Sequence, residues 1–140
     1  MMNGTPSTAG QTRGPVRGFT VARRSNCGKI FTTINISQET NLPVNVLVRF
    51  GKAGGCGSAL ADGIATLLSM NLRSGLDPRE TIKAISGIGC HLGSRTCLNA
   101  VAESIGFVLV HLETGQDLND MIEEHDFSHA NKDEQWEPFE

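Results

Sequence analysis

The sequence predicts an α+β domain, in which a small antiparallel sheet of about three strands is followed by three helices packed on one face of the sheet. Two observations carry this prediction. Residues 19–50 are rich in β-branched residues with strand-like alternation, whereas residues 58–112 repeat apolar residues at helical spacing. At 140 residues the chain is expected to form one domain with two tails. We expect a flexible arm over 1–18, the domain over 19–115, and an acidic, largely disordered tail over 116–140.

Three segments have strand character. Residues 19–22 are a short candidate, residues 29–36 are β-branched and roughly alternating, and residues 44–50 are the clearest strand. Turn-like residues separate the last two segments. We therefore expect these two to pair as an antiparallel hairpin.

Three segments have helical character. The first covers residues 58–73 and carries Leu60, Ala61, Ile64, Leu67, Leu68 and Leu72 at helical spacing. The second is short and ends at Gly87; it starts at Asp77, with Pro in the first turn and Glu at the third position, which are three agreeing signals of a helix start. The third opens at Cys97 and keeps one apolar face as far as Leu112.

Charge is distributed unevenly along the chain. Residues 1–112 hold 11 Lys and Arg against 5 Asp and Glu, whereas residues 113–140 hold 1 against 10. A basic body predicts an anionic ligand or partner. The acidic tail could compete for that surface, although a solvated tail that aids solubility is the simpler interpretation. The tail also contains Trp136 and Phe139. These two side chains are candidates for contacts with a partner or a second copy of the chain; the alternative is that they have no functional contact.

No run of 18 apolar residues occurs, so we expect no membrane span. The first 18 residues lack the apolar block of an export signal. The sequence therefore favours a cytoplasmic protein with reduced thiols, in which four cysteines are better suited to metal chemistry than to disulfides.

The four cysteines, Cys27, Cys56, Cys90 and Cys97, stand in glycine-flanked turns or at predicted helix starts. Thiolates brought together from turns are what a tetrahedral structural zinc site requires. Their spacing lacks paired C-x-x-C knuckles, so small buried hydrophobes remain an alternative. Iron–sulfur ligation by the same thiols also remains open. His91 is a spare ligand candidate, although a solvated loop histidine is the more common case.

A glycine-rich loop over residues 51–57 joins a predicted strand to a predicted helix. Backbone N–H groups at such a junction can bind phosphate. No Gly-Lys-Ser/Thr triplet closes the loop, so it is not a Walker A motif, and the glycines could instead serve to bring Cys56 to a metal. The candidate ligand-binding residues are Arg49, Lys52, Gly54, Gly55, Gly57 and Ser58.

No catalytic constellation is apparent. The predicted body has few carboxylates, and two of them, Asp77 and Glu80, are explained as parts of a helix start. The chain has no Tyr, and its single Trp lies in the tail, so the sequence shows no aromatic and basic platform for nucleic acid. The interpretation leans away from an enzyme.

Four segments in order resemble the TSCPD domain, which is typically found at the C-terminal end of adenosylcobalamin-dependent (class II) ribonucleotide reductases. They read NCGKIFTTIN at 26–35, VLVRFGKAGGC at 46–56, LRSGLDP at 72–78 and GIGC at 87–90. The resemblance covers about residues 13–112. It implies that all four cysteines belong to the family pattern and supports zinc as a structural cofactor. The name-giving motif departs from the family pattern, because the chain reads RTCLN here, so that its cysteine remains while Pro and Asp are replaced.

Three functions follow from this resemblance and from the residues. The first is a free-standing, zinc-stabilised accessory or interaction module of ribonucleotide reduction. It would bind a reductase subunit or a nucleic acid, although no motif in the sequence supports nucleic acid. The catalytic barrel and the C-terminal redox cysteine pair of the reductases are not seen, so a complete reductase is not expected. The alternative is an oligomeric small-ligand protein that binds a nucleotide or phosphate. The third is a thiol redox protein with reactive cysteines.

Overall fold

The computed structural model describes residues 16–51, 55–90, 93 and 95–132, without the side chains of 55, 56 and 129–132. Within these residues a three-stranded antiparallel sheet is followed by four helices, so the predicted α+β class is confirmed. Residues 1–15 of the arm expected over 1–18 lie outside the described residues.

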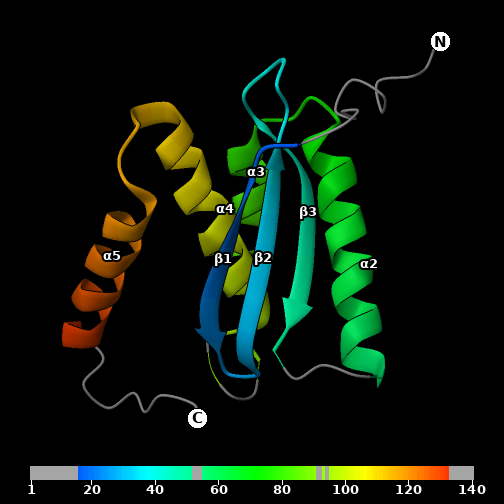
Figure 1. The fold of residues 1–140 in the computed structure, drawn as a ribbon. Helices are drawn as coiled ribbons and strands as arrows, with labels where there is room; N and C mark the ends of the chain where they lie inside the picture. Colours follow the sequence, from blue (N-terminus) through cyan, green and yellow to red (C-terminus); the bar gives the residue numbers. More distant parts are fainter. Residues whose placement is uncertain (1–15, 52–54, 91–92, 94, 133–140) are drawn as a thin grey trace.

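The sheet has the order β1 (Gly18–Ser25), β2 (Gly28–Ile36) and β3 (Pro43–Phe50), and both pairs of neighbours are antiparallel (Figure 1). Because side chains alternate along each strand, one face collects the apolar residues. Ile30 and Ile34 on the central strand are fully buried on this inner face. All three predicted strands are therefore confirmed.

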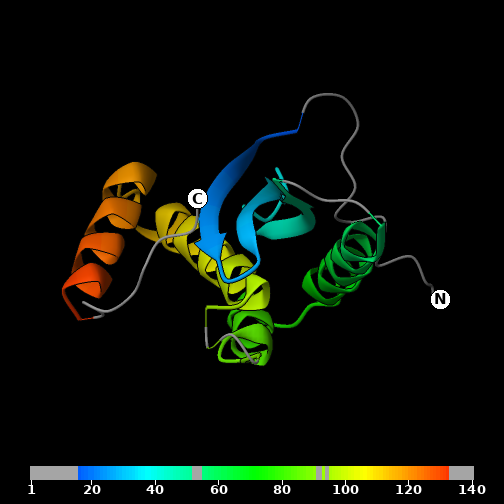
Figure 2. The same cartoon turned by 90° about the horizontal axis from the view of Figure 1, so that it is seen from below.

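Four helices follow the sheet in the chain: α2 (Gly55–Leu72), α3 (Pro78–Ile85), α4 (Cys97–Thr114) and α5 (Leu118–Lys132). In Figure 1 and Figure 2, α4 lies behind β1 and β2, α3 lies beside α4, and α2 flanks β3. The predicted cap of α3 is present, because the Asp77 carboxylate accepts a hydrogen bond from the Arg79 N–H at 3.0 Å.

The core lies between the inner face of the sheet and the helices α2 and α4. Ile105 and Val108 of α4 are 0% exposed and belong to one cluster with Ile30 and Ile34. The face predicted for α2 is only partly correct. Ala61, Leu68 and Leu72 are buried, but Leu60 and Leu67 are 66% and 67% exposed, since α2 flanks the edge strand instead of crossing the sheet.

Side-chain hydrogen bonds hold α2 against the free edge of β3. The Ser69 hydroxyl accepts from the Val46 N–H at 2.9 Å and donates to the Ala65 carbonyl at 2.8 Å. Arg73 donates to the Val44 carbonyl at 3.2 Å. Helix α2 therefore satisfies groups on an edge that would otherwise be open to pairing with another chain.

Replacing Ser69 with alanine should lower the free energy of unfolding by about 1–3 kcal/mol, because the buried Val46 N–H loses its acceptor. Urea denaturation measures this change as a shift in midpoint. Ser74→Ala is the control, since the exposed Ser74 hydroxyl bonds only to the backbone of nearby residues, donating to the Asn71 carbonyl and accepting from the Leu76 N–H at 3.5 Å. Equal midpoints for the two variants would contradict this account of the edge.

Helix α5 lies within residues 116–140, where a disordered tail was expected. Met121 is only 9% exposed, and Leu118 and Ile122 pack against the core. On β1, the Arg23 guanidinium pairs with Glu103 of α4 at 3.0 Å and with Asp126 of α5 at 2.9 Å. Contacts that come from distant strands and helices order this acidic segment up to Lys132; residues 133–140, with Trp136 and Phe139, lie outside the described residues.

The ion pair makes the docking of α5 sensitive to pH. Partial burial alone would raise the pKa of Asp126, but hydrogen bonding and charge from Arg23 outweigh it and hold this pKa below its ordinary value of 3.8. A lowered carboxyl pKa stabilises the fold above the ordinary value, and this stabilisation is lost as pH falls through the folded-state pKa.

We therefore expect Asp126→Asn to lose less stability than the parent between about pH 6 and about pH 3. The difference should be no more than about 1 kcal/mol, because Asp126 is half exposed. Urea denaturation at the two pH values gives this difference. Glu123→Gln is the control, since Glu123 forms no ion pair within the described part of the chain, and it should follow the parent. Parallel curves for Asp126→Asn and the parent would disprove the role of the pair.

Helix α4 is long and apolar enough to cross a membrane by length and composition alone, the one such helix among the described residues. Its buried residues, among them Ala100, Val101, Ile105 and Val108, pack in the core cluster against the sheet. A core helix passes the same test.

Candidate functional site

The elements that carry the four cysteines meet at one end of the molecule. The turn between β1 and β2, the start of α2 and the start of α4 lie together at the lower end in Figure 1. The Asn26 N–H donates to the Arg95 carbonyl at 2.6 Å and so joins the β1–β2 turn to the segment before α4. Cys27, Cys97 and Gly57, which follows Cys56, line one cavity. The turn that carries Cys27 is therefore adjacent to the start of α4.

The side chains of Cys27 and Cys97 interact with each other. Cys97 opens α4 after the N-cap Thr96, whose hydroxyl accepts from the Asn99 N–H at 3.1 Å. Burial raises the pKa of the Cys97 thiol, and the charge of Cys27 and a hydrogen bond with it raise this pKa further. The N–H groups of Cys97 and Leu98 act in the opposite direction but do not prevail. A helix start by itself favours a thiolate, but burial and Cys27 outweigh this effect and favour the neutral thiol at Cys97.

Cys90 lies in the loop between α3 and α4. It forms an isolated antiparallel bridge with Gly93, and each N–H donates to the carbonyl of the other residue at 2.9 Å. Gly93 has φ 120°, a backbone conformation that L side chains rarely adopt, and an added Cβ would stand 3.6 Å from the Asn26 amide nitrogen. That amide nitrogen is buried and has no hydrogen-bond partner among the described residues. The bridge therefore closes a turn directly beside the turn that carries Cys27.

The four-thiol metal site stays a prediction. Cys27, Cys90 and Cys97 form no disulfide, and the side chain of Cys56 and all of His91 lie outside the described residues. Among the described side chains, no three His, Cys, Asp or Glu gather closely enough to hold a metal ion. The donor chemistry nevertheless fits zinc in one respect, since a divalent cation would stabilise the thiolate form of Cys97 that burial and Cys27 disfavour.

The surroundings of this thiol pair are apolar. The cavity has a volume of about 420 Å³ and is lined mainly by Ile30, Val48, Phe50, Leu60, Ala61, Ile64, Leu98 and Val101, in addition to Cys27, Gly57 and Cys97. An apolar wall lowers the local dielectric and strengthens the attraction between a thiolate and a cation. The same wall makes an uncompensated thiolate costly, in keeping with the raised pKa of Cys97.

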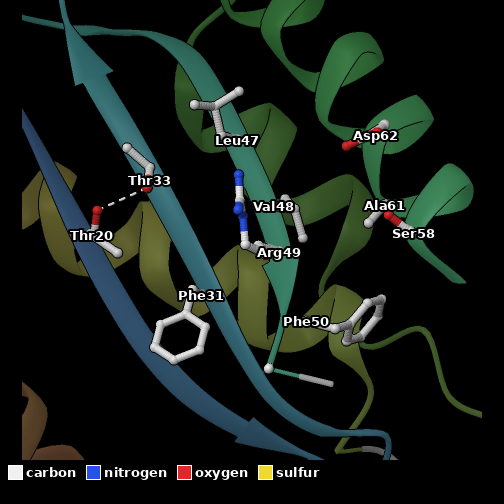
Figure 3. Close-up of a pocket in the computed structure, with 11 residues that line it drawn as sticks. Thr20, Phe31, Thr33, Leu47, Val48, Arg49, Phe50, Ser58, Ala61 and Asp62 are labelled. Atoms are coloured by element: carbon white, nitrogen blue, oxygen red, sulfur yellow. Dashed lines mark hydrogen bonds between the residues drawn. The ribbon is translucent and has the colours of Figure 1, made fainter. Parts of the chain in front are cut away.

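The candidate ligand-binding residues separate into three groups. Arg49 and Ser58 line one groove of about 660 Å³ between the sheet and α2 (Figure 3). Gly57 lines the cysteine cavity, and Gly55 is the first residue of α2. Lys52 and Gly54 lie outside the described residues.

The groove with Arg49 contains features that the sequence alone did not indicate. Phe31 and Phe50 line it, and the hydroxyls of Thr20 and Thr33 lie 2.8 Å apart at one side (Figure 3). Asp62 of α2 forms the opposite side. The signal for Phe31 was its place in the alternation of β2, beside buried Ile30 and Thr32, which puts it on the other face of the sheet.

Comparison with known proteins gives one match. A family model described as the TSCPD domain matches residues 8–109, which is well over half of the chain. No curated protein and no solved structure matches the chain. The matched range includes all three strands, α2 and α3, and most of α4, together with the four cysteines. The chain therefore belongs to the TSCPD domain family.

Proposed function

We propose that this TSCPD domain is a zinc-stabilised module of the cytoplasm that acts as an accessory or interaction protein in ribonucleotide reduction. The observation that supports it best is the contact of Cys27 and Cys97, two thiols far apart in sequence, at the end of the molecule where the other two cysteine segments also meet. Cys27, Cys56, Cys90 and Cys97 would hold the metal. The link to ribonucleotide reduction rests on the family.

In this proposal zinc has a structural role. A bound Zn²⁺ supplies a positive charge that keeps the cysteines as thiolates and ties their segments together. The chain contributes the turn at Cys27, which is fixed to the segment before α4 by the hydrogen bond from Asn26 to Arg95. It also contributes the cap at Thr96, which starts α4 beside that turn. A closed site of four thiolates leaves no open position for catalysis.

Elemental analysis and native mass spectrometry of freshly purified protein test the metal. We expect one zinc per chain and a colourless solution. A brown solution that contains iron and sulfide would mean that the four thiols hold an iron–sulfur cluster instead of zinc. Metal-free protein with thiols that react readily with a disulfide reagent would favour the thiol redox function instead.

The accessory role needs a separate test, because a zinc site alone does not identify a partner. The full chain is mixed with an adenosylcobalamin-dependent ribonucleotide reductase from the same source, and complex formation is followed by size-exclusion chromatography and calorimetry. We expect a complex that persists at micromolar concentration. Separate elution of the two proteins with no heat of binding would disprove the accessory role and leave the zinc proposal unaffected.

A second function, an oligomeric protein that binds a nucleotide or phosphate, is favoured by one observation. Arg49 and Ser58, both candidates from the sequence, line the same groove, and the Arg49 guanidinium makes no hydrogen bond or ion pair with another described residue. A groove of this volume suits a small ligand. Binding at a hundredfold excess over Kd should stabilise the protein by about 2.7 kcal/mol.

A thermal-shift panel of nucleotides tests this second function. We expect a rise in melting temperature that Arg49→Ala removes and that Lys83→Ala, an exposed change on α3, retains. A flat panel with the parent protein would exclude it. Sedimentation of the parent with and without nucleotide reports the oligomeric state.

A further inference from the structure

The outer face of the sheet is not covered by any described helix. In Figure 1 and Figure 2, α3 and α4 lie behind the sheet, α2 lies at its β3 edge and α5 lies on its β1 side. Strand register places Thr20, Thr33 and Leu47 in one row across this face, and Ala22, Phe31 and Arg49 in the next. Leu47 is 55% exposed. An antiparallel sheet can be stable with one face buried and the other exposed to solvent. The residue types on the exposed face therefore indicate what that face contacts.

This face is cationic. The three strands contain Arg and Lys but neither Asp nor Glu. Arg23 points to the inner side and is paired with Glu103 and Asp126. On the outer side, Arg24 is opposite Lys29 in register, and Arg49 lies in the neighbouring row; all three are exposed. Asp62 of α2 marks the boundary of the groove.

An aromatic ring stands at the centre of these cations. Phe31 is on the middle strand, half-buried, between Ala22 and Arg49 in register, and the Lys29 Nζ lies 5.9 Å from the centre of its ring. Beyond it are neutral hydrogen-bonding groups. These are the Thr20 and Thr33 hydroxyls, and the Asn35 amide, which donates to the Asn45 side-chain oxygen at 3.1 Å.

We propose that this outer face binds single-stranded nucleic acid, an activity that does not depend on the function proposed above. A base stacks on Phe31, Lys29 and Arg49 bind the phosphates, and the hydroxyls and amides of the next rows face the sugars and base edges. A sheet face with a partly exposed ring can stack unstacked bases, which a duplex does not present.

The positive charge of the outer face favours single-stranded nucleic acid over other occupants. The whole chain carries a net charge of −3, so its overall charge does not attract a polyanion. The local surplus of positive charge on this face does. A second copy packed face to face would set Lys29 and Arg49 against cations of the same kind. An apolar partner would bury the same cations without a counter-charge, which is costly.

Fluorescence anisotropy with a labelled strand of about twelve nucleotides, as oligo-dT and oligo-U, tests the proposal. With two phosphate contacts, log K should fall with log salt at a slope of about −1.4, so affinity should fall about sevenfold between 50 and 200 mM salt. A duplex of the same length should bind at least about tenfold more weakly, because its bases stay stacked.

Three variants of the full chain locate the site. Phe31→Leu keeps apolar bulk but loses the stacking surface, and affinity should fall about tenfold. Lys29→Gln should reduce the salt slope by about 0.7, which a merely structural role would not do. Lys83→Gln on α3 removes one equally exposed charge and should change neither quantity. Melting temperature and zinc content are measured for each variant, so that a loss of fold is distinguished from a loss of contact.

The outcomes separate this proposal from the others. No anisotropy change up to about 100 µM, or equal binding by duplex, would overturn it. Unchanged affinity in Phe31→Leu would place any binding elsewhere and also overturn it. Stabilisation by free nucleotides without binding of the strand would support the small-ligand function in its place. Zinc content tests the structural metal in every case, so failure of one proposal is not failure of the other.

Discussion

Cys97→Ser is expected to lose zinc and to lower the melting temperature by about 10 °C or more. The reason is that binding of a structural zinc contributes directly to the free energy of folding, and the whole stability of a domain is only about 5–15 kcal/mol. Cys97 stands where α4 begins and contacts Cys27 of the β1–β2 turn. Loss of one thiolate therefore loosens both the sheet turn and the start of α4. Differential scanning calorimetry with parallel zinc analysis measures the effect.

Two controls separate the metal from the helix start. Thr96→Ala removes the cap of α4 and should cost about 1 kcal/mol while zinc stays bound. A chelator should lower the melting temperature of the parent almost to that of Cys97→Ser and should change the variant little. If Cys97→Ser melts like the parent and retains a full complement of zinc, the ligand role of Cys97 is disproved.

Ile105→Ala is the second change with a large expected effect. Ile105 is 0% exposed and packs between α4 and the sheet, within the cluster that contains Ile30 and Ile34. Truncation removes buried methyl and methylene groups and leaves a cavity, which should lower the free energy of unfolding by about 2–5 kcal/mol. Urea denaturation should show a lower midpoint with an unchanged slope.

The matched control for this core change is on the same helix. Val110 is 39% exposed, so Val110→Ala should alter the free energy of unfolding by no more than about 0.5 kcal/mol. Similar losses for the two variants would mean that α4 does not turn its Ile105 side toward the sheet. The same outcome would remove the structural basis for an uncovered outer face.

The strands and three of the helices were predictable because their signals are local. Alternation in β2 and helical spacing in α4 are set by which side of an element must be apolar. The start of α3 at Asp77 was equally local, since one carboxylate and one N–H within the same turn make the cap. The exposed Leu60 and Leu67 of α2 were not predictable, because helical spacing does not say how much of an apolar stripe finds a partner.

Helix α5 depends on residues far from it in the chain. Its own sequence is acidic and has few apolar residues, so local propensity and composition favour disorder. Met121 is buried only because α4 lies beside it, and Asp126 is ordered by Arg23 of β1. Tertiary contacts of this kind regularly override weak local preferences.

The candidate sites divide in the same way. In the linear chain, glycine-flanked turns and helix starts mark the four cysteines. Alternation alone puts Phe31 and Arg49 on one side of their strands, because neighbouring side chains in a strand point to opposite faces. Which of these residues become neighbours depends on long-range packing. Cys27 reaches Cys97 only because α4 starts beside the β1–β2 turn, and Phe31 meets Arg49 only through the register of β2 with β3. Such contacts join residues far apart in sequence, and no pattern within a single helix or strand contains them.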